Sequence, residues 1–92
     1  MDDKINAITE LFKEAGQTHH HAFIETDGAD EDWPIWYADF LVDRLSELLD
    51  ARLTRTQIVV LLVELDRQQK AIAPGVNWTR YYAKELVTRY SI

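Results

Sequence analysis

The sequence contains no cysteine. This excludes a disulfide-stabilised scaffold, a thiolate nucleophile and any zinc or iron–sulfur site with cysteine ligands. Long apolar runs are missing as well. The longest, from Ile58 to Val63, is far below the roughly 18 residues that a membrane-spanning helix needs. We therefore expect no membrane interaction.

Positive charge is scarce. Lysine and arginine total 10 against 16 aspartates and glutamates, which makes the formal net charge −6. Neutralising phosphate groups needs a basic surface, so this balance argues against a general nucleic-acid-binding protein. The segment Met1 to Lys4 is acidic and lacks the apolar region of a secretory signal, which leads us to expect a cytoplasmic protein.

Glycine and proline are sparse, with three and two residues in a chain of 92. Because an all-β domain of this size needs many turns, their scarcity favours long helices. The length fits one domain, residues 1–92. The apolar spacing predicts helices over about residues 3–25, 33–50, 54–70 and 78–90.

The first predicted helix carries one apolar stripe with alternating spacings of three and four residues. The stripe consists of Ile5, Ile8, Phe12, Ala15, His19, Ala22 and Thr26. Gly16 lies within this helix and destabilises it by about 1 kcal/mol relative to alanine. Asp27 and Gly28 are expected to end it, since glycine tolerates the left-handed backbone found at many helix ends.

The third predicted helix has the clearest start. Thr54 and Gln57 have the spacing of a capping box, and Leu53 with Ile58 fits the accompanying hydrophobic staple. Residues 58–63 alone are also compatible with a buried strand. The cap and the helix-favouring residues that follow decide for a helix.

A repeat with a spacing of 45 residues relates the second and fourth predicted helices. Trp33, Tyr37, Ala38, Leu41, Val42 and Arg44 recur as Trp78, Tyr82, Ala83, Leu86, Val87 and Arg89. The repeat predicts an all-α four-helix bundle built from two helical hairpins, each entering its second helix through a tryptophan. Alternatively, aromatic helix starts simply look alike. We expect Trp33, Trp36 and Trp78 in the core.

The same region carries a resemblance. The motif HHAFIETDG over residues 20–28, followed by DWPIWYADFL over residues 32–41 and a later Trp-x-x-Tyr-Tyr-Ala, resembles a group of short, uncharacterised bacterial helical proteins. The resemblance covers about residues 20–90 and implies a stand-alone bacterial domain. It implies no catalytic or binding residue.

The histidines His19, His20 and His21 are the densest group of possible metal ligands. Consecutive side chains on a helix point about 100° apart, so these three cannot converge on one ion. Only His21 with Glu25 has a spacing that lets both contact one metal, with further ligands from elsewhere. We therefore predict no metal and no cofactor, and interpret His19 as a partly buried bundle residue.

Catalytic motifs are equally scarce. Ser46 and Ser91 are distant from any histidine in sequence, and no glycine-rich phosphate loop occurs. An acid–base pair of His19 with Asp39 or Tyr37 is geometrically allowed across an antiparallel hairpin, but any bundle with three histidines offers such pairs. We name no catalytic residue, and this favours a protein that is not an enzyme.

Arg44 and Arg89 occupy equivalent places in the repeat, each near the centre of an apolar helix face. A buried guanidinium needs a partner, which leaves two interpretations open. Each arginine snorkels to the surface or pairs with a carboxylate such as Glu14 or the C-terminus, or both converge on an anion pocket. Arg44, Arg89 and His19 are thus the candidate ligand-binding residues.

Charge is distributed unevenly along the chain. Residues 1–50 carry 3 basic and 13 acidic side chains, net −10, whereas residues 51–92 carry 7 basic and 3 acidic ones, net +4. The two hairpins either attract each other within the fold or leave an acidic stripe for a basic protein partner. That stripe consists of Asp39, Asp43, Glu47 and Asp50.

These observations predict a small non-enzymatic module for protein interaction or regulation, acting through a protein partner or as a homodimer. The alternative is a helical bundle that binds a small anion or a metal, with or without catalysis.

Overall fold

The computed structural model describes residues 2–90, which form four α-helices and one short 3₁₀ helix. The elements are α1 (Asp2–Ala22), η1 (Ile24–Thr26), α2 (Trp33–Leu49), α3 (Arg55–Ile72) and α4 (Trp78–Tyr90). No strand occurs in these residues, and the predicted all-α four-helix bundle is confirmed. Within the same residues, no helix combines the length and the apolar character that crossing a membrane requires.

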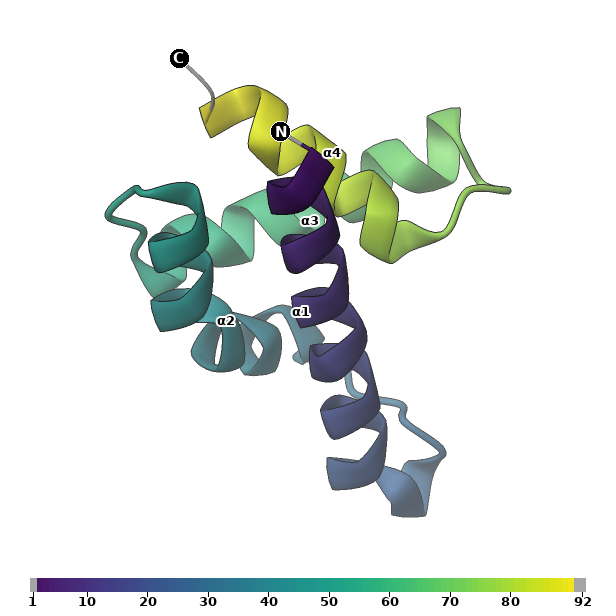
Figure 1. The fold of residues 1–92 in the computed structure, drawn as a ribbon. Coiled ribbons are helices and arrows are strands. Elements are labelled where there is room, and N and C mark those ends of the chain that lie inside the picture. The colour runs from purple at the N-terminus through teal and green to yellow at the C-terminus, as the bar shows by residue number, and fades with distance from the viewer. Residues whose placement is uncertain (1, 91–92) are drawn as a thin grey trace.

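The helices cross one another rather than running side by side throughout. Figure 1 shows α1 running down the molecule with η1 near its lower end, while α3 runs across it. The most extensive packing joins α1 to α4 and α2 to α3, and α1 also packs against α2. In the two predicted hairpins, the helices therefore pack more extensively against helices of the other hairpin than against each other.

The first helix ends earlier than predicted, at Ala22 instead of residue 25. Asp27 and Gly28 both adopt positive φ, 56° and 86°, and the amide of Gly28 donates to the carbonyl of Phe23 at 2.8 Å. These left-handed residues close a tight turn, so residues 24–26 are drawn into the 3₁₀ helix η1. The bounds of the other helices lie within two residues of the predicted ones.

Side-chain caps begin α3 and α4. The amide of Gln57 donates to Thr54 Oγ1 at 3.1 Å, and the amide of Thr54 donates to Gln57 Oε1 at 2.8 Å, so the predicted capping box is present. Residues 58–63 lie inside this helix, and the strand interpretation is wrong. Asn77 Oδ1 accepts from the amide of Thr79 at 3.0 Å at the start of α4.

The core is built from the apolar faces of all four helices. Its largest fully buried side chains are Ile8, Leu11, Phe12, Leu41, Leu45, Ile58, Leu62, Leu65 and Leu86. Gln69 is buried at its edge and donates to the carbonyls of Ala73 and Val76 at 3.0 and 2.9 Å. This amide ties the loop between α3 and α4 to α3.

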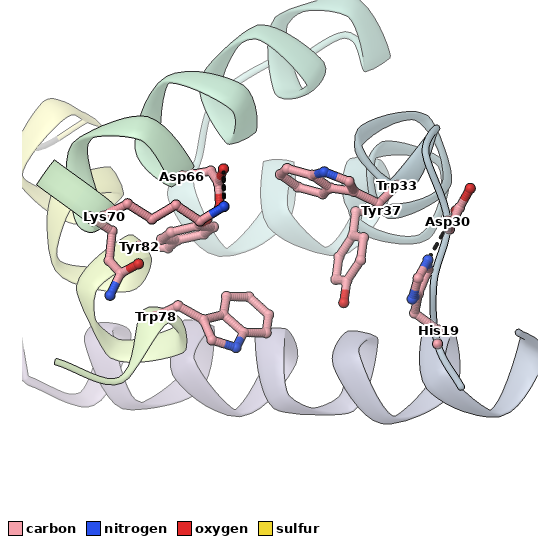
Figure 2. A pocket seen from close by; sticks show the side chains of 10 residues that line it. His19, Asp30, Trp33, Tyr37, Asp66, Lys70, Trp78 and Tyr82 are labelled. Atoms are coloured by element: carbon pink, nitrogen blue, oxygen red, sulfur yellow. Dashed lines mark hydrogen bonds and ion pairs between the residues drawn. The ribbon is translucent and has the colours of Figure 1, made fainter. Parts of the chain in front are cut away.

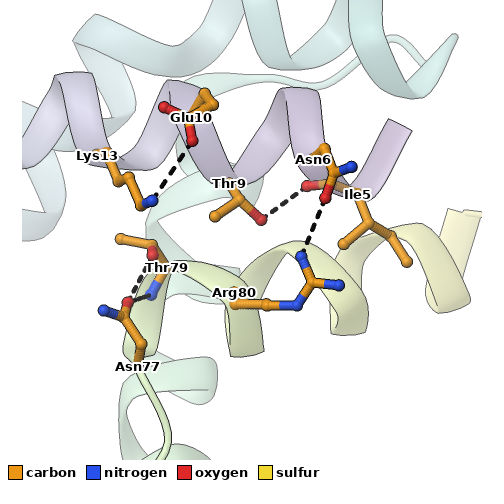
Figure 3. A network of polar contacts seen from close by, with 8 residues as sticks. All are labelled: Ile5, Asn6, Thr9, Glu10, Lys13, Asn77, Thr79 and Arg80. Carbon is orange, nitrogen blue, oxygen red and sulfur yellow. Dashed lines mark hydrogen bonds and ion pairs between the residues drawn. The ribbon is translucent and has the colours of Figure 1, made fainter. Parts of the chain in front are cut away.

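A polar seam runs along the contact between α1 and the first turns of α4 (Figure 3). Arg80 Nη1 donates to Asn6 Oδ1 at 3.1 Å, and Thr9 Oγ1 donates to the carbonyl of Ile5 at 2.7 Å. Together with the Asn77 cap, the seam orients the start of α4, where Trp78 lies.

The capping box is expected to make a measurable contribution to the stability of the fold. Thr54→Ala removes the acceptor of the Gln57 amide and should lower the free energy of unfolding by about 1 kcal/mol. Thr56→Ala is the matched control, because Thr56 is an exposed threonine in the same helical turn that takes no part in the box. Urea denaturation followed by circular dichroism measures both variants, and equal stabilities of the two would contradict the prediction.

Candidate functional site

His19 is buried among aromatic rings and paired with an acid. Its side chain is 7% exposed, and its Nε2 lies 3.0 Å from Oδ2 of Asp30. The ring centroids of Phe23, Trp36 and Tyr37 lie 4.8, 4.9 and 5.0 Å from that of the imidazole. This burial agrees with the predicted place of His19 in the bundle, and its acidic partner comes from the loop before α2.

Arg44 and Arg89 are tied to separate carboxylates. Arg44 Nη1 lies 2.8 Å from Glu14 Oε2, and Arg89 Nη2 lies 2.9 Å from Glu64 Oε1. Their side chains are 56% and 29% exposed, so the expectation of buried guanidinium groups on an apolar face is wrong. Arg44 lies beside the buried positions of α2, which are Ala38, Leu41, Leu45 and Leu49. The pairing with Glu14 follows the first interpretation.

The predicted acidic stripe lies on exposed positions of α2 and at its C-terminal end. Asp39 Oδ1 accepts from Arg55 Nη1 at 2.9 Å, so one carboxylate of the stripe already has a partner at the start of α3. Asp50 has a φ of 51° and ends α2 in the left-handed region. Binding of a basic partner by the stripe of Asp39, Asp43, Glu47 and Asp50 stays a prediction.

A cavity of about 350 Å³ opens between α2, α3, α4 and the loop before α2. Four aromatic side chains line its middle, Trp33 and Tyr37 from α2 and Trp78 and Tyr82 from α4 (Figure 2). We call this cavity the aromatic pocket.

The four rings are the aromatic positions of the 45-residue repeat. In each helix the tryptophan and the tyrosine are four residues apart and so lie on one face. Trp33, Trp36 and Trp78 are all only partly buried, so the expectation that they lie in the core is wrong. Trp33 and Trp78 pack at the margin of the core and line the pocket.

An acid–base pair lies at each end of the row of rings. Figure 2 shows His19 with Asp30 at one end and Lys70 with Asp66 at the other, where Lys70 Nζ lies 3.1 Å from Asp66 Oδ2. The Tyr82 hydroxyl donates to Asp66 Oδ1 at 3.4 Å. Burial raises the pKa of the Tyr82 phenol, and the nearby Asp66 charge raises that pKa further. The pocket is thus aromatic in the middle and polar at both ends.

Two glycines allow this arrangement. A Cβ atom on Gly16 would lie 3.3 Å from Cζ2 of Trp78, so the glycine lets the indole pack closely against α1. At Gly28 a Cβ would lie 2.7 Å from Nδ1 of His20, and the positive φ of this residue also favours glycine. The mid-helix glycine that looked unfavourable in the sequence therefore has a packing role at the pocket.

Most residues of the pocket are not recognisable as a site in the sequence. The repeated aromatic residues lie on apolar helix faces and so resemble core residues, although the Trp-x-x-x-Tyr spacing shared by two helices is a usable signal. Asp66 and Lys70 gave no separate signal, because oppositely charged residues four apart are common on exposed helix surfaces. Asp30 stood in an acidic run with nothing to distinguish it from its neighbours.

Within residues 2–90, no three histidine or carboxylate side chains come together as metal ligands. Comparisons with protein-family models, with curated proteins and with solved structures find no match. The resemblance of residues 20–90 to a bacterial group therefore stays a prediction, and function is inferred from the pocket itself.

The raised pKa of Tyr82 predicts a loss of stability at alkaline pH. The folded state holds the phenolic proton more tightly than the unfolded chain does. This stabilisation is therefore complete below the ordinary tyrosine pKa of 10.0 and is lost as the pH rises above it. Tyr82→Phe removes the titrating group, so the variant should lose less free energy of unfolding between about pH 8 and pH 11. Urea denaturation across this range measures the difference, and equal losses in both proteins would overturn the prediction.

Proposed function

We propose that this protein is a non-enzymatic binding module and that its binding site is the aromatic pocket. One observation carries the proposal. Two repeated pairs of large aromatic side chains, which meet one another edge to face, also line one cavity. Small-molecule sites are commonly cavities of about 300–1,000 Å³ with apolar walls and a few polar groups, and the aromatic pocket has this composition.

The exposed area of these rings supports the proposal energetically. A domain this small buries a limited fraction of its surface. Apolar area that stays exposed at a cavity therefore contributes nothing to the stability of the fold. Trp33 and Trp78 are both only partly buried. A ligand group that covers these two side chains removes their exposed apolar area from water, which contributes about 25 cal/mol of binding free energy per Å².

The polar groups of the pocket are held in place by their neighbours. His19 is engaged by Asp30, and Asp66 by Lys70. These pairs are suited to orienting a ligand at the two ends of the rings. The protein-interaction function expected from the sequence fits the same site if the bound group belongs to a protein partner.

Nuclear magnetic resonance of the three indole N–H groups tests the proposal. Trp33 and Trp78 report on the pocket, whereas Trp36, which does not line it, is an internal control. Indole, isobutanol, tetramethylammonium and acetate represent aromatic, apolar, cationic and anionic ligands. We expect at least one to shift the Trp33 and Trp78 signals saturably while the Trp36 signal changes little.

Two matched variants complete this test. Trp33→Leu removes one wall of the pocket and should weaken binding about tenfold, since an aromatic contact and its burial together contribute about 1.4 kcal/mol. Tyr81→Leu makes a comparable change at a partly buried aromatic residue of α4 that does not line the pocket, and this variant should bind as the unaltered protein does. If none of the four probes shifts the pocket signals, or if both variants bind equally, the proposed site is wrong.

A further inference from the structure

The four rings of the aromatic pocket form a continuous row in which each is steeply inclined to the next. Trp33 and Tyr37 meet at 85° with centroids 5.8 Å apart, Tyr37 and Trp78 at 82° and 6.1 Å, and Trp78 and Tyr82 at 66° and 5.2 Å. The rings are thus joined edge to face, and all four line the pocket together. A cation held among several aromatic rings is attracted by their π-electrons.

The charge of the pocket also favours a cation. Two carboxylates, Asp30 and Asp66, line it together with one ammonium group, that of Lys70. An anionic ligand would meet these two carboxylates and the electron-rich rings together, and both would repel it.

The hydrogen bonds of the pocket indicate which kind of cation fits. Each of the four carboxylate oxygens on Asp30 and Asp66 already has a partner, from His19, Asp32, Lys70 or Tyr82. A primary ammonium brings three N–H donors that would lose water, and on these two carboxylates they would have to share oxygens that already accept a hydrogen bond. A quaternary ammonium carries no N–H donor, and its methyl groups match the aromatic walls.

The size and the opening of the pocket agree with such a ligand. A volume of about 350 Å³ accommodates a trimethylammonium group and part of the chain attached to it. An adjoining groove of about 700 Å³ shares His19, Gly28, Tyr37 and Trp78 with the pocket. This groove offers a path for the rest of the ligand along α1.

We infer that the aromatic pocket is a cage for an alkylated ammonium group. The inference rests on the proposed function and specifies its ligand class. The same group occurs in free choline-like molecules and on trimethylated lysine side chains, and the pocket chemistry is shared by both.

Choline and its uncharged isostere 3,3-dimethylbutan-1-ol test the inference, because they share shape and differ in charge. Isothermal titration calorimetry on the full chain should show choline binding at least about tenfold more tightly than the isostere. Choline should also bind at least about tenfold more tightly than ethanolamine, which carries a primary ammonium. Equal affinities within either pair would overturn the cage.

The failures of the two proposals are distinguishable. If indole or isobutanol occupies the pocket and choline does not, the cage is wrong and the binding site stands. If none of these molecules shifts the Trp33 and Trp78 signals, both proposals fail.

Substitutions at Trp33 separate the aromatic ring from apolar volume. Trp33→Leu should lower choline affinity about tenfold while the isostere is affected less, and Trp33→Phe should retain most choline binding because it keeps an aromatic face. Tyr81→Leu is the matched control, because Tyr81 does not line the pocket, and should bind choline as the unaltered protein does. Thermal melting establishes that each variant is folded, and unchanged choline affinity in folded Trp33→Leu would contradict the inference.

A pair of short peptides identifies the source of the group. A tripeptide with a central trimethyllysine is compared with choline and with the same tripeptide carrying unmodified lysine. Tighter binding of the trimethylated peptide than of choline points to a protein partner, and the reverse order points to a free small molecule. Equal binding of the two peptides would exclude trimethyllysine as the source, and the cage would then depend on the choline comparison alone.

Discussion

The apolar face of α1 is the surface against which both walls of the pocket are positioned. Phe12 on this face is completely buried and meets Trp78 and Tyr82 edge to face, with centroids 5.9 and 5.6 Å away. The same helix packs against α2, which carries the other two rings. One helix face therefore sets the separation of the repeated aromatic pairs, and Gly16 brings Trp78 close to it.

The polar contacts hold the loops that border the pocket. Asp30 joins the loop before α2 to His19 on α1, and its second oxygen accepts the amide of Asp32 just before that helix. Gln69 does the same for the loop between α3 and α4 through two backbone carbonyls. Because a partly buried carboxylate without its partner is strongly unfavourable, these contacts resist loosening of the pocket edges.

The aromatic residues have a structural and a binding role at once. Tyr82 is 3% exposed and belongs to the core, yet its ring and hydroxyl also line the pocket. Trp33 and Trp78 are less buried and keep part of their surface at the cavity. Natural sequences depart from the best-packed arrangement mainly where function requires it, which fits a site placed where the core is left incomplete.

The sequence by itself determined the fold class, the approximate helix ranges and the cap of α3, because these depend on interactions within about four residues. It also showed that Trp33 and Tyr37 are equivalent to Trp78 and Tyr82. It did not show where the first helix ends, since the turn there depends on two left-handed residues and their hydrogen bonds. Periodicity identifies the apolar face of a helix but not the neighbour that covers it, which is why Arg44 was expected to be buried. Only the tertiary structure decided that the two repeated faces border a cavity, because the crossing of α2 and α4 over α1 determines whether equivalent rings fill the core or leave space between them.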